Sequence, residues 1–248
     1  MCFAISINEE KLEKVTERIA KVSRSSIEIN FNHELYRPYH FVSGFSFPDL
    51  PVLVENRLEL FKWGLIPSWV KDNQTASELR SNTLNAKSET IFEKPSFRKA
   101  ITNQRCIIPV NGFIEWQTVD KEKIPYFIKP AETEFFLFGG LYDRWINPDT
   151  NEVINTFSII TTAANPMMTE IHNSKKRMPF ILDSYKIDQW LDVSSSKNVV
   201  QSLFSSYDEK LMTAYTISKS VNSSKVNKNT TDILKPVDYS PPTELTLF

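Results

Sequence analysis

The sequence predicts an α+β fold in a single compact domain, and three observations carry this prediction. Apolar runs typical of strands come in groups, with helical patterns between the groups. Several neighbouring runs have short connections, which favours antiparallel hairpins over a doubly wound parallel sheet. Glycine is scarce, at 5 of 248 residues, and neither GxGxxG nor GxxxxGK(S/T) occurs, which excludes Rossmann and P-loop phosphate sites.

The clearest helix lies near the N-terminus. Leu12, Val15, Ile19 and Val22 recur at helical spacing with charged residues between them, and Asn8 is the predicted N-cap. Further helices or helical turns are predicted over residues 85–92, 96–104, 165–171, 184–191 and 199–204.

Strands are predicted from short runs rich in β-branched and aromatic residues. Within residues 106–116, Asn111-Gly112 separates two apolar segments, which is the signal of a hairpin closed by a type I′ turn. The other predicted strands are residues 57–63, 126–129, 135–141, 156–162 and 212–217.

Composition limits the class of protein. Hydrophobic residues make up 41% and charged residues 24%, as in a globular chain, and a net charge of −1 argues against a generic nucleic-acid coat while allowing a local basic groove. No apolar run is long enough for a bilayer and no signal peptide is recognised, so we expect a cytoplasmic protein without membrane contact. Cys2 and Cys106 should then be thiols, and no metal or cofactor is expected from them or from the three histidines.

Cys2 is the most informative single residue. Removal of Met1 would leave an α-amine and a thiol on one carbon skeleton, a 1,2-aminothiol. The amine, with a pKa near ~7.7–8.0, attacks aldehydes, and the thiol can then close a five-membered thiazolidine ring. The alternative is that Cys2 is merely a small residue near a ragged terminus.

Two further titratable residues are candidates for catalysis. Glu115 alternates with apolar neighbours in a predicted strand, where a carboxyl would have a raised pKa suited to acid–base chemistry, unless it faces water at a sheet edge. His172 precedes the cations Lys175, Lys176 and Arg177, which suits an anionic substrate such as a phosphodiester backbone. The ordinary alternative for His172 is a structural hydrogen-bonding role, and the ordinary alternative for the three cations is a solvated loop.

Trp63 and Trp69 flank a glycine and a proline in a predicted loop. Such an arrangement can stack the bases of single-stranded DNA. Core packing is the ordinary alternative for either ring.

Several motifs, taken in order, carry a family resemblance. They are Met1-Cys2, Trp63-Gly64-Leu65-Ile66-Pro67-Ser68-Trp69, Asn85-Ala86-Lys87-Ser88-Glu89, and residues 105–116, 161–172 and 177–179. This set, spread over residues 1–220, resembles the SRAP family, the SOS response-associated peptidases or abasic-site-processing proteins.

The resemblance implies a barrel-like mixed sheet flanked by helices and a positively charged channel for single-stranded DNA. It implies an active site of Cys2, Asn85, Glu115 and His172, in which Cys2 condenses with the ring-opened aldehyde of an abasic site and forms a covalent crosslink. Asn85 would hold the Cys2 terminus, Glu115 would transfer protons, and His172 would stabilise the sugar hydroxyl. AP-lyase and autoproteolytic activities are implied as well.

The resemblance and the cation run also indicate a set of DNA-binding residues. They are Trp63, Trp69, Lys87, Thr161, Thr162, Lys175, Lys176 and Arg177. Three departures from the family pattern bear on them: Phe3 and Ala4 replace a usual Gly-Arg, Lys87 stands where Arg is common, and residues 173–176 are extra.

Two other functions stay open at this point. An N-terminal-nucleophile amidohydrolase also begins with a cysteine, although no Gly-rich loop offers an oxyanion hole. A non-catalytic module for single-stranded DNA, with Cys2 incidental, is the second.

The domain is predicted to span residues 1–220, followed by a flexible tail over residues 221–248 without core residues. The tail ends in apolar residues and resembles the peptide by which bacterial proteins dock to the replication sliding clamp. Leu245, Leu247 and Phe248 would be its anchors, and the alternative is that they fold back onto the domain.

Overall fold

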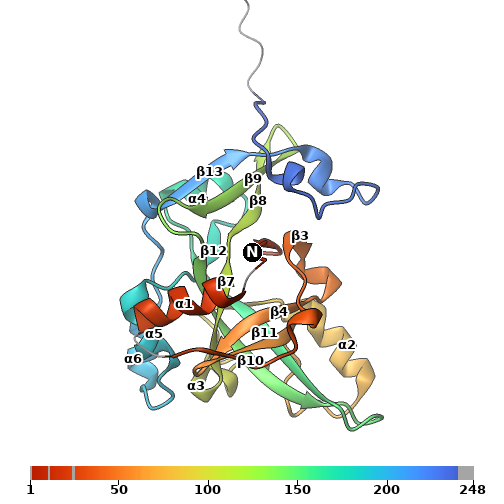
Figure 1. Ribbon diagram of the computed structural model, residues 1–248, viewed down its shortest axis with the longest axis vertical. Coiled ribbons are helices and arrows are strands. Elements are labelled where there is room, and N and C mark those ends of the chain that lie inside the picture. The colour runs from red at the N-terminus through yellow and green to blue at the C-terminus, as the bar shows by residue number, and fades with distance from the viewer. Residues whose placement is uncertain (1, 11, 24–25, 240–248) are drawn as a thin grey trace, which may run out of the picture.

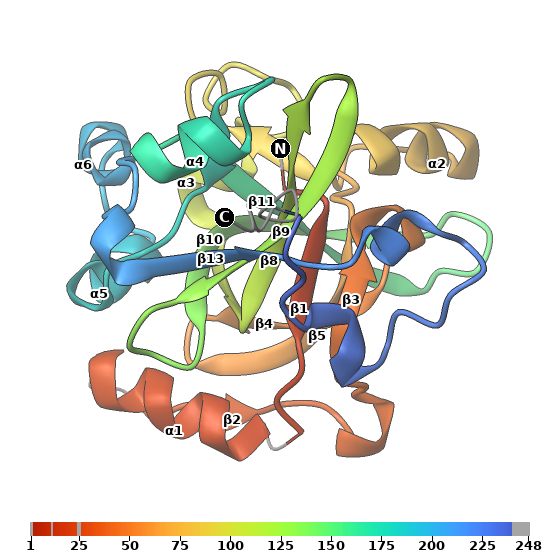
Figure 2. The ribbon, with the colours of Figure 1, turned by 90° about the horizontal axis from the view of Figure 1, so that it is seen from above.

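The computed structural model describes residues 2–10, 12–23 and 26–239, and it contains two β-sheets with short helices placed around them (Figures 1 and 2). Most strand pairs are antiparallel, and the parallel pairs involve β5 and β11. The predicted α+β class is confirmed.

Five strands close into a mixed barrel. They are β4 (Asp49–Val54), β5 (Arg57–Trp63), β7 (Arg105–Val110), β10 (Phe136–Ile146) and β11 (Val153–Ala163). β5 pairs with β4, β4 with β7, β7 with β10 and β10 with β11, all antiparallel. β11 then returns to β5 in the parallel direction, which closes the ring and confirms the barrel-like sheet.

The second sheet holds the N-terminal strand between two others. In spatial order its strands are β13 (Met212–Thr216), β9 (Glu122–Pro130), β8 (Gly112–Val119), β1 (Ala4–Ile7) and β3 (Tyr39–Ser43). β1 is antiparallel to both neighbours, with Ala4 opposite Ile114 on one side and Ser43 on the other. The start of the chain is therefore fixed inside a sheet rather than at its edge.

The predicted hairpin around Asn111-Gly112 is wrong. β7 belongs to the barrel and β8 to the second sheet, and the chain crosses between them at Asn111. Neither Asn111 nor Gly112 has the positive φ that a type I′ turn requires. Close packing explains the glycine at position 112 instead, because a Cβ there would lie 2.6 Å from the Ile128 carbonyl oxygen and 2.5 Å from the Phe127 ring.

The other strand predictions are confirmed, since each overlaps an observed strand and β5 has the predicted bounds. The predicted helix over residues 85–92 is wrong, because Asn85–Lys87 form β6, which pairs with β11. Turns follow β6 where the helix was expected. The remaining short strands are β2 (Glu28–Ile29) and β12 (Arg177–Pro179).

The helices match most of the predicted ranges. They are α1 (Leu12–Ser23), α2 (Asn73–Asn82), α3 (Ala100–Asn103), α4 (Pro166–Ile171), α5 (Ile187–Leu191) and α6 (Lys197–Leu203). α1 buries Leu12, Val15 and Ile19 as its spacing predicts, but its first turn lies beyond Asn8, whose N–H donates instead to Asn111 Oδ1. Among the described residues, no helix has both the length and the apolar character that crossing a membrane requires.

The prediction of a tail without core residues is wrong for residues 221–239. Val221, Ile233 and Leu234 are buried, and a 3₁₀ turn spans Thr231–Leu234. The Val237 N–H also donates to the Thr216 carbonyl oxygen of β13. The apolar residues are spaced too widely to show a period, yet each packs on the second sheet. The predicted clamp anchors Leu245, Leu247 and Phe248 lie outside the described residues.

Replacing Gly112 by Ala should destabilise the protein by about 2–3 kcal/mol, because the added Cβ meets backbone that cannot move aside easily. The measurement is urea unfolding, with Gly44→Ala as the matched variant. A Cβ at position 44 meets only side chains, at 3.1–3.2 Å, so its loss should be smaller. Equal stability of Gly112→Ala and the wild type would contradict this account of the crossing.

Candidate active site

Cys2 is fully buried where the chain enters β1. Ala4, two residues further on, pairs with Ile114, so strand pairing brings Cys2 to the part of β8 that carries Glu115. Burial raises the pKa of the Cys2 thiol well above its ordinary value, and the Glu115 carboxylate adds to the effect. The thiol is therefore neutral at neutral pH. Cys2 and Cys106 are both free of disulfides.

Asn85 holds the main chain at Cys2. It is the first residue of β6, whose pairing with β11 at Ile159 fixes its position beside the barrel. Its Nδ2 donates to the Cys2 carbonyl oxygen over 2.8 Å. Its Oδ1 is buried and accepts no hydrogen bond from any described residue. Leaving a buried acceptor without a hydrogen bond costs about 1–3 kcal/mol. A ligand group that donates a hydrogen bond to Oδ1 would therefore bind favourably.

Glu115 lies on β8 with 4% of its surface exposed, so the water-facing alternative is excluded. Burial raises the pKa of Glu115 to about 7. A carboxyl that titrates near neutral pH can both donate and accept a proton in a reaction.

His172 follows directly after α4, and its Nε2 faces Glu115 at 3.9 Å from Oε2. Its Nδ1 lies 2.9 Å from the Arg177 carbonyl oxygen. Because a carbonyl oxygen can only accept, the proton of the neutral ring resides on Nδ1 and the lone pair on Nε2. Burial lowers the pKa of His172, which favours this neutral form.

Hydrogen bonds tie the end of α4 to β8. The Gln117 amide donates to the Glu170 carbonyl oxygen at 3.2 Å. Asn173 accepts from the Thr118 N–H at 3.1 Å and donates to the Thr118 carbonyl oxygen at 2.9 Å. His172 lies between these contacts and is therefore held against the strand that carries the acid.

A cavity of about 370 Å³ opens at Glu115 and His172. Its other walls come from Phe3, Trp116, Lys123, Ser174, Lys175 and Asn222. Lys123 is the charged member that no sequence pattern singles out, because it sits in an exposed hairpin with no motif around it. Two larger cavities lie away from the four candidate catalytic residues.

Three residues predicted to bind DNA, Trp63, Thr161 and Thr162, are buried in this structure. Trp63 has no exposed surface: its ring stacks on Phe157 with centroids 6.1 Å apart, and its Nε1 donates to the Leu84 carbonyl oxygen. Thr161 and Thr162 are 0% and 6% exposed. Base stacking requires an exposed ring face, so the burial of Trp63 contradicts its predicted stacking role, while contact of Thr161 and Thr162 with DNA stays a prediction.

Arg177 is bound within the protein. Its guanidinium donates to both oxygens of Glu89, at 2.7 and 2.9 Å, and to the Thr161 carbonyl oxygen at 2.6 Å. Since its own carbonyl oxygen accepts from His172, the anchored Arg177 helps to hold that ring. Sequence spacing could not reveal this contact, because it runs through the backbone.

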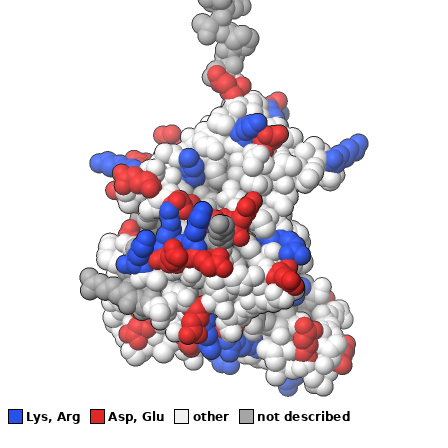
Figure 3. All heavy atoms as spheres, viewed as in Figure 1, with Lys and Arg blue, Asp and Glu red and all other residues white. Residues whose placement is uncertain are grey.

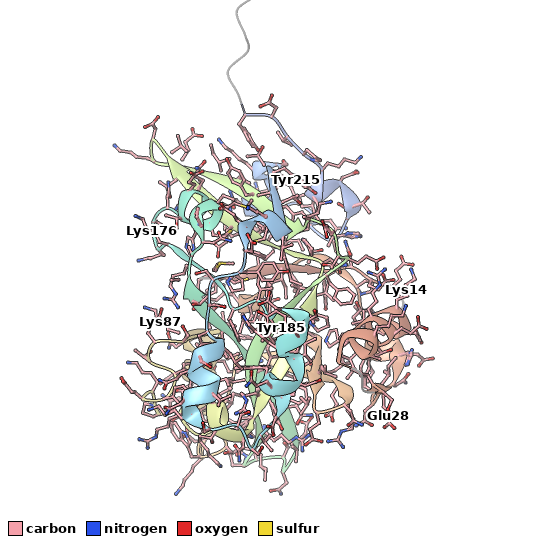
Figure 4. All side chains as sticks on the ribbon, turned by 90° about the vertical axis from the view of Figure 1, so that its left-hand side faces the viewer. Lys14, Glu28, Lys87, Lys176, Tyr185 and Tyr215 are labelled. Atoms are coloured by element: carbon pink, nitrogen blue, oxygen red, sulfur yellow. The ribbon has the colours of Figure 1, made fainter. Side chains whose placement is uncertain are left out.

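The face shown in Figure 3 has no uniform sign of charge, because blue and red side chains lie side by side over α1. On another side of the molecule, Lys87 and Lys176 lie along the same edge in Figure 4. Lys87, Lys175 and Lys176 are exposed, and Trp69 is 49% exposed. These four residues remain accessible to a nucleic acid. Within the described ranges, no group of three or more His, Cys, Asp or Glu is arranged to hold a metal ion.

Comparison with known proteins identifies the family. The family described as SOS response associated peptidase (SRAP) matches residues 1–224. Over 174 residues the chain is 43% identical to abasic site processing protein YoqW of Bacillus subtilis (strain 168), covering 69% of this chain and 74% of YoqW. It is 30% identical over 205 residues to abasic site processing protein HMCES of Pongo abelii, covering 71% of this chain and 56% of HMCES.

A crystal structure of a protein from Bacteroides thetaiotaomicron has the same fold, with a TM-score of 0.87 and 36% identity over 95% of this chain and 100% of that one. The barrel and the second sheet together define a domain that holds Cys2, the second residue of the chain, beside a buried acid and a histidine. The chain belongs to the SRAP family, which confirms the resemblance in its sequence.

Replacing Glu115 by Gln should flatten the dependence of stability on pH. An acid whose pKa is raised to about 7 by folding contributes stability that is fully present below its ordinary pKa and is lost as pH rises through 7. Between about pH 5 and pH 8 the wild type should lose roughly 2–3 kcal/mol relative to Glu115→Gln. Urea unfolding at both pH values measures this difference.

Glu170→Gln is the matched control for that experiment, because Glu170 is an exposed acid on α4 and its removal should leave the pH profile as in the wild type. Parallel profiles for Glu115→Gln and the wild type would show that Glu115 titrates in the ordinary carboxyl range.

Proposed function

We propose that the protein captures abasic sites in single-stranded DNA through a covalent thiazolidine crosslink to Cys2, formed after removal of Met1. The observation that carries the proposal is the convergence of Cys2, Asn85, Glu115 and His172 where β1 meets β8. The substrate class is supported by the names of relatives such as YoqW and HMCES, which are called abasic site processing proteins.

The chemistry needs no external reagent. The Cys2 α-amine adds to the C1′ aldehyde of the ring-opened sugar, and the carbinolamine loses water to give an imine. The sulfur then adds to the imine carbon while the thiol proton passes to nitrogen, which closes the ring. In total one C–N bond and one C–S bond form and one water molecule leaves, with no change of oxidation state that would require a redox partner.

Each side chain has a step that its environment suits. Glu115, with its pKa near 7, protonates the departing hydroxyl and then relays the proton of the thiol to the nitrogen. Asn85 Oδ1, buried without a described partner, accepts a hydrogen bond from the α-amine. His172 presents Nε2 to a sugar hydroxyl beside Glu115.

Cysteine amidohydrolase activity is disfavoured by the same surroundings. Such an enzyme requires a reactive thiolate, whereas burial raises the pKa of Cys2. The imine intermediate does permit β-elimination, so AP-lyase activity at this site is part of the proposal, while no peptide cleavage beyond Met1 is needed. A cytoplasmic location and docking to the sliding clamp stay predictions.

Cys2→Ala should abolish the heat-stable adduct with an abasic oligonucleotide, because the amine can still form an imine but no sulfur can close the ring. Intact mass after incubation measures this, and the adduct of the wild type should equal protein without Met1 plus DNA minus one water. Cys106→Ala is the control and should crosslink normally, since Cys106 lies in the barrel strand β7. A heat-stable adduct in Cys2→Ala, or none in the wild type, would refute the mechanism.

Affinity for single-stranded DNA should fall with salt, with a slope of roughly −0.7 in log K against log salt for each phosphate contact. The double variant Lys87→Gln, Lys176→Gln should weaken binding and reduce this slope by about one or more. Lys14→Gln, on the side of the molecule opposite these lysines in Figure 4, should change neither. Identical slopes in the wild type and the double variant would remove both lysines from the interface.

A further inference from the structure

The cavity at Glu115 and His172 has a lysine on each of two separate segments. Lys123 lies at the start of β9, and Lys175 lies in the turn that follows α4. Both line the cavity together with the acid and the histidine. Residues more than fifty positions apart in the sequence thus bring two positive charges to the mouth of one site.

Both lysines are positioned relative to the same residue of β8. The Lys123 Nζ donates to Thr118 Oγ1 over 2.7 Å. The turn that carries Lys175 is docked on Thr118 by the two Asn173 hydrogen bonds, at 3.1 and 2.9 Å. Thr118 lies on the same strand as Glu115, three residues further on. The two cations are therefore held in a defined relation to the acid.

Neither Lys123 nor Lys175 forms a salt bridge with a carboxylate of the described residues. Two other cations do form salt bridges: Lys219 pairs with Glu122, and Arg177 pairs with Glu89. The Lys123 ammonium lies close enough to Glu115 to lower its pKa, against the larger effect of burial. With His172 neutral, the cavity carries a local positive charge in a protein whose net charge is −1.

We propose that Lys123 and Lys175 form a phosphate subsite that binds a phosphate flanking the abasic sugar. This inference rests on the proposed function. A sugar bound at Glu115 would bring an attached phosphate to the mouth of the cavity, where the two ammonium groups lie. Binding there orients the sugar toward Cys2 and makes recognition depend on the backbone rather than on a base.

The test is binding of single-stranded oligonucleotides that contain a tetrahydrofuran abasic analogue, which cannot react with Cys2. Three versions carry an ordinary phosphate on both sides, or a neutral methylphosphonate on the 5′ or the 3′ side of the analogue. The wild type should lose about fivefold to twentyfold in affinity with one of the two methylphosphonates, as for loss of a charge-assisted contact.

The double variant Lys123→Gln, Lys175→Gln should show that same loss with the ordinary oligonucleotide and no further loss with that methylphosphonate. Its salt slope should fall by roughly 0.7. Lys129→Gln, an exposed lysine on the same strand β9, is the matched control and should behave as the wild type. A double variant that keeps the full sensitivity of the wild type to both methylphosphonates overturns the subsite.

A second pair of oligonucleotides, ending at the analogue with or without a terminal phosphate, separates the two sources of phosphate. Tighter binding of the terminal phosphate than of the internal phosphodiester assigns the subsite to a strand end, and the reverse assigns it to continuous DNA. Because none of these probes crosslinks, failure of the subsite leaves the Cys2 mechanism standing. Failure of the wild type to bind any of them overturns both.

Discussion

The pairing of β1 with β8 is the constraint on which the site depends. It places Cys2 beside Glu115, and it does so in the interior of a sheet, where hydrogen bonds on both sides of β1 prevent the N-terminal segment from shifting. The same β8 receives α4 through Gln117 and Thr118, and so fixes His172. One strand therefore sets the relative positions of Cys2, Glu115 and His172.

The barrel supplies the remaining support from the other direction. β6 adds to β11 and brings Asn85 to the Cys2 carbonyl oxygen, while β12 adds to the same strand and brings the Arg177 carbonyl oxygen to His172. Both contacts run to or from backbone, so each depends on the positions of strands more than on side-chain rotamers. A rigid closed ring is well suited to hold them, because its strands cannot slide independently.

Sequence reasoning located the catalytic candidates but not the way they are held. Cys2, Asn85, Glu115 and His172 stand out through their motifs, and the structure brings them together. The Asn111-Gly112 hairpin fails because a local turn signal cannot reveal which sheet each flanking strand joins. Trp63 fails because an indole in a loop motif has the same sequence whether it faces DNA or the core, and only the packing of Phe157 against it decides.

Lys123 could not be predicted from the sequence for a related reason. Its significance arises only from the fold, which brings the β8–β9 hairpin and the turn after α4 to the same cavity. The same holds for residues 221–239, in which the few apolar side chains show no period. This segment nevertheless contributes Asn222 to the cavity wall, and Asn222 Oδ1 accepts a hydrogen bond from Trp116 Nε1. Contacts of this range are set by tertiary packing, which a window along the chain does not sample.

Burial shifts the pKa values of the acids and of the histidine in this site in opposite directions. It raises the pKa of the Cys2 thiol and lowers that of His172, so both favour their neutral forms near pH 7, and it raises the pKa of Glu115 to about 7, where its neutral and ionised forms are both populated. Keeping Cys2 and His172 neutral limits the desolvation cost of buried ions, and a carboxyl that titrates near pH 7 can both donate and accept a proton. The positive charge of the cavity lies at its mouth, on Lys123 and Lys175, where an anionic strand would contact it. In the function proposed above, this separation of the buried titratable groups from the charged rim lets attraction of DNA and proton transfer operate in one cavity without either disturbing the other.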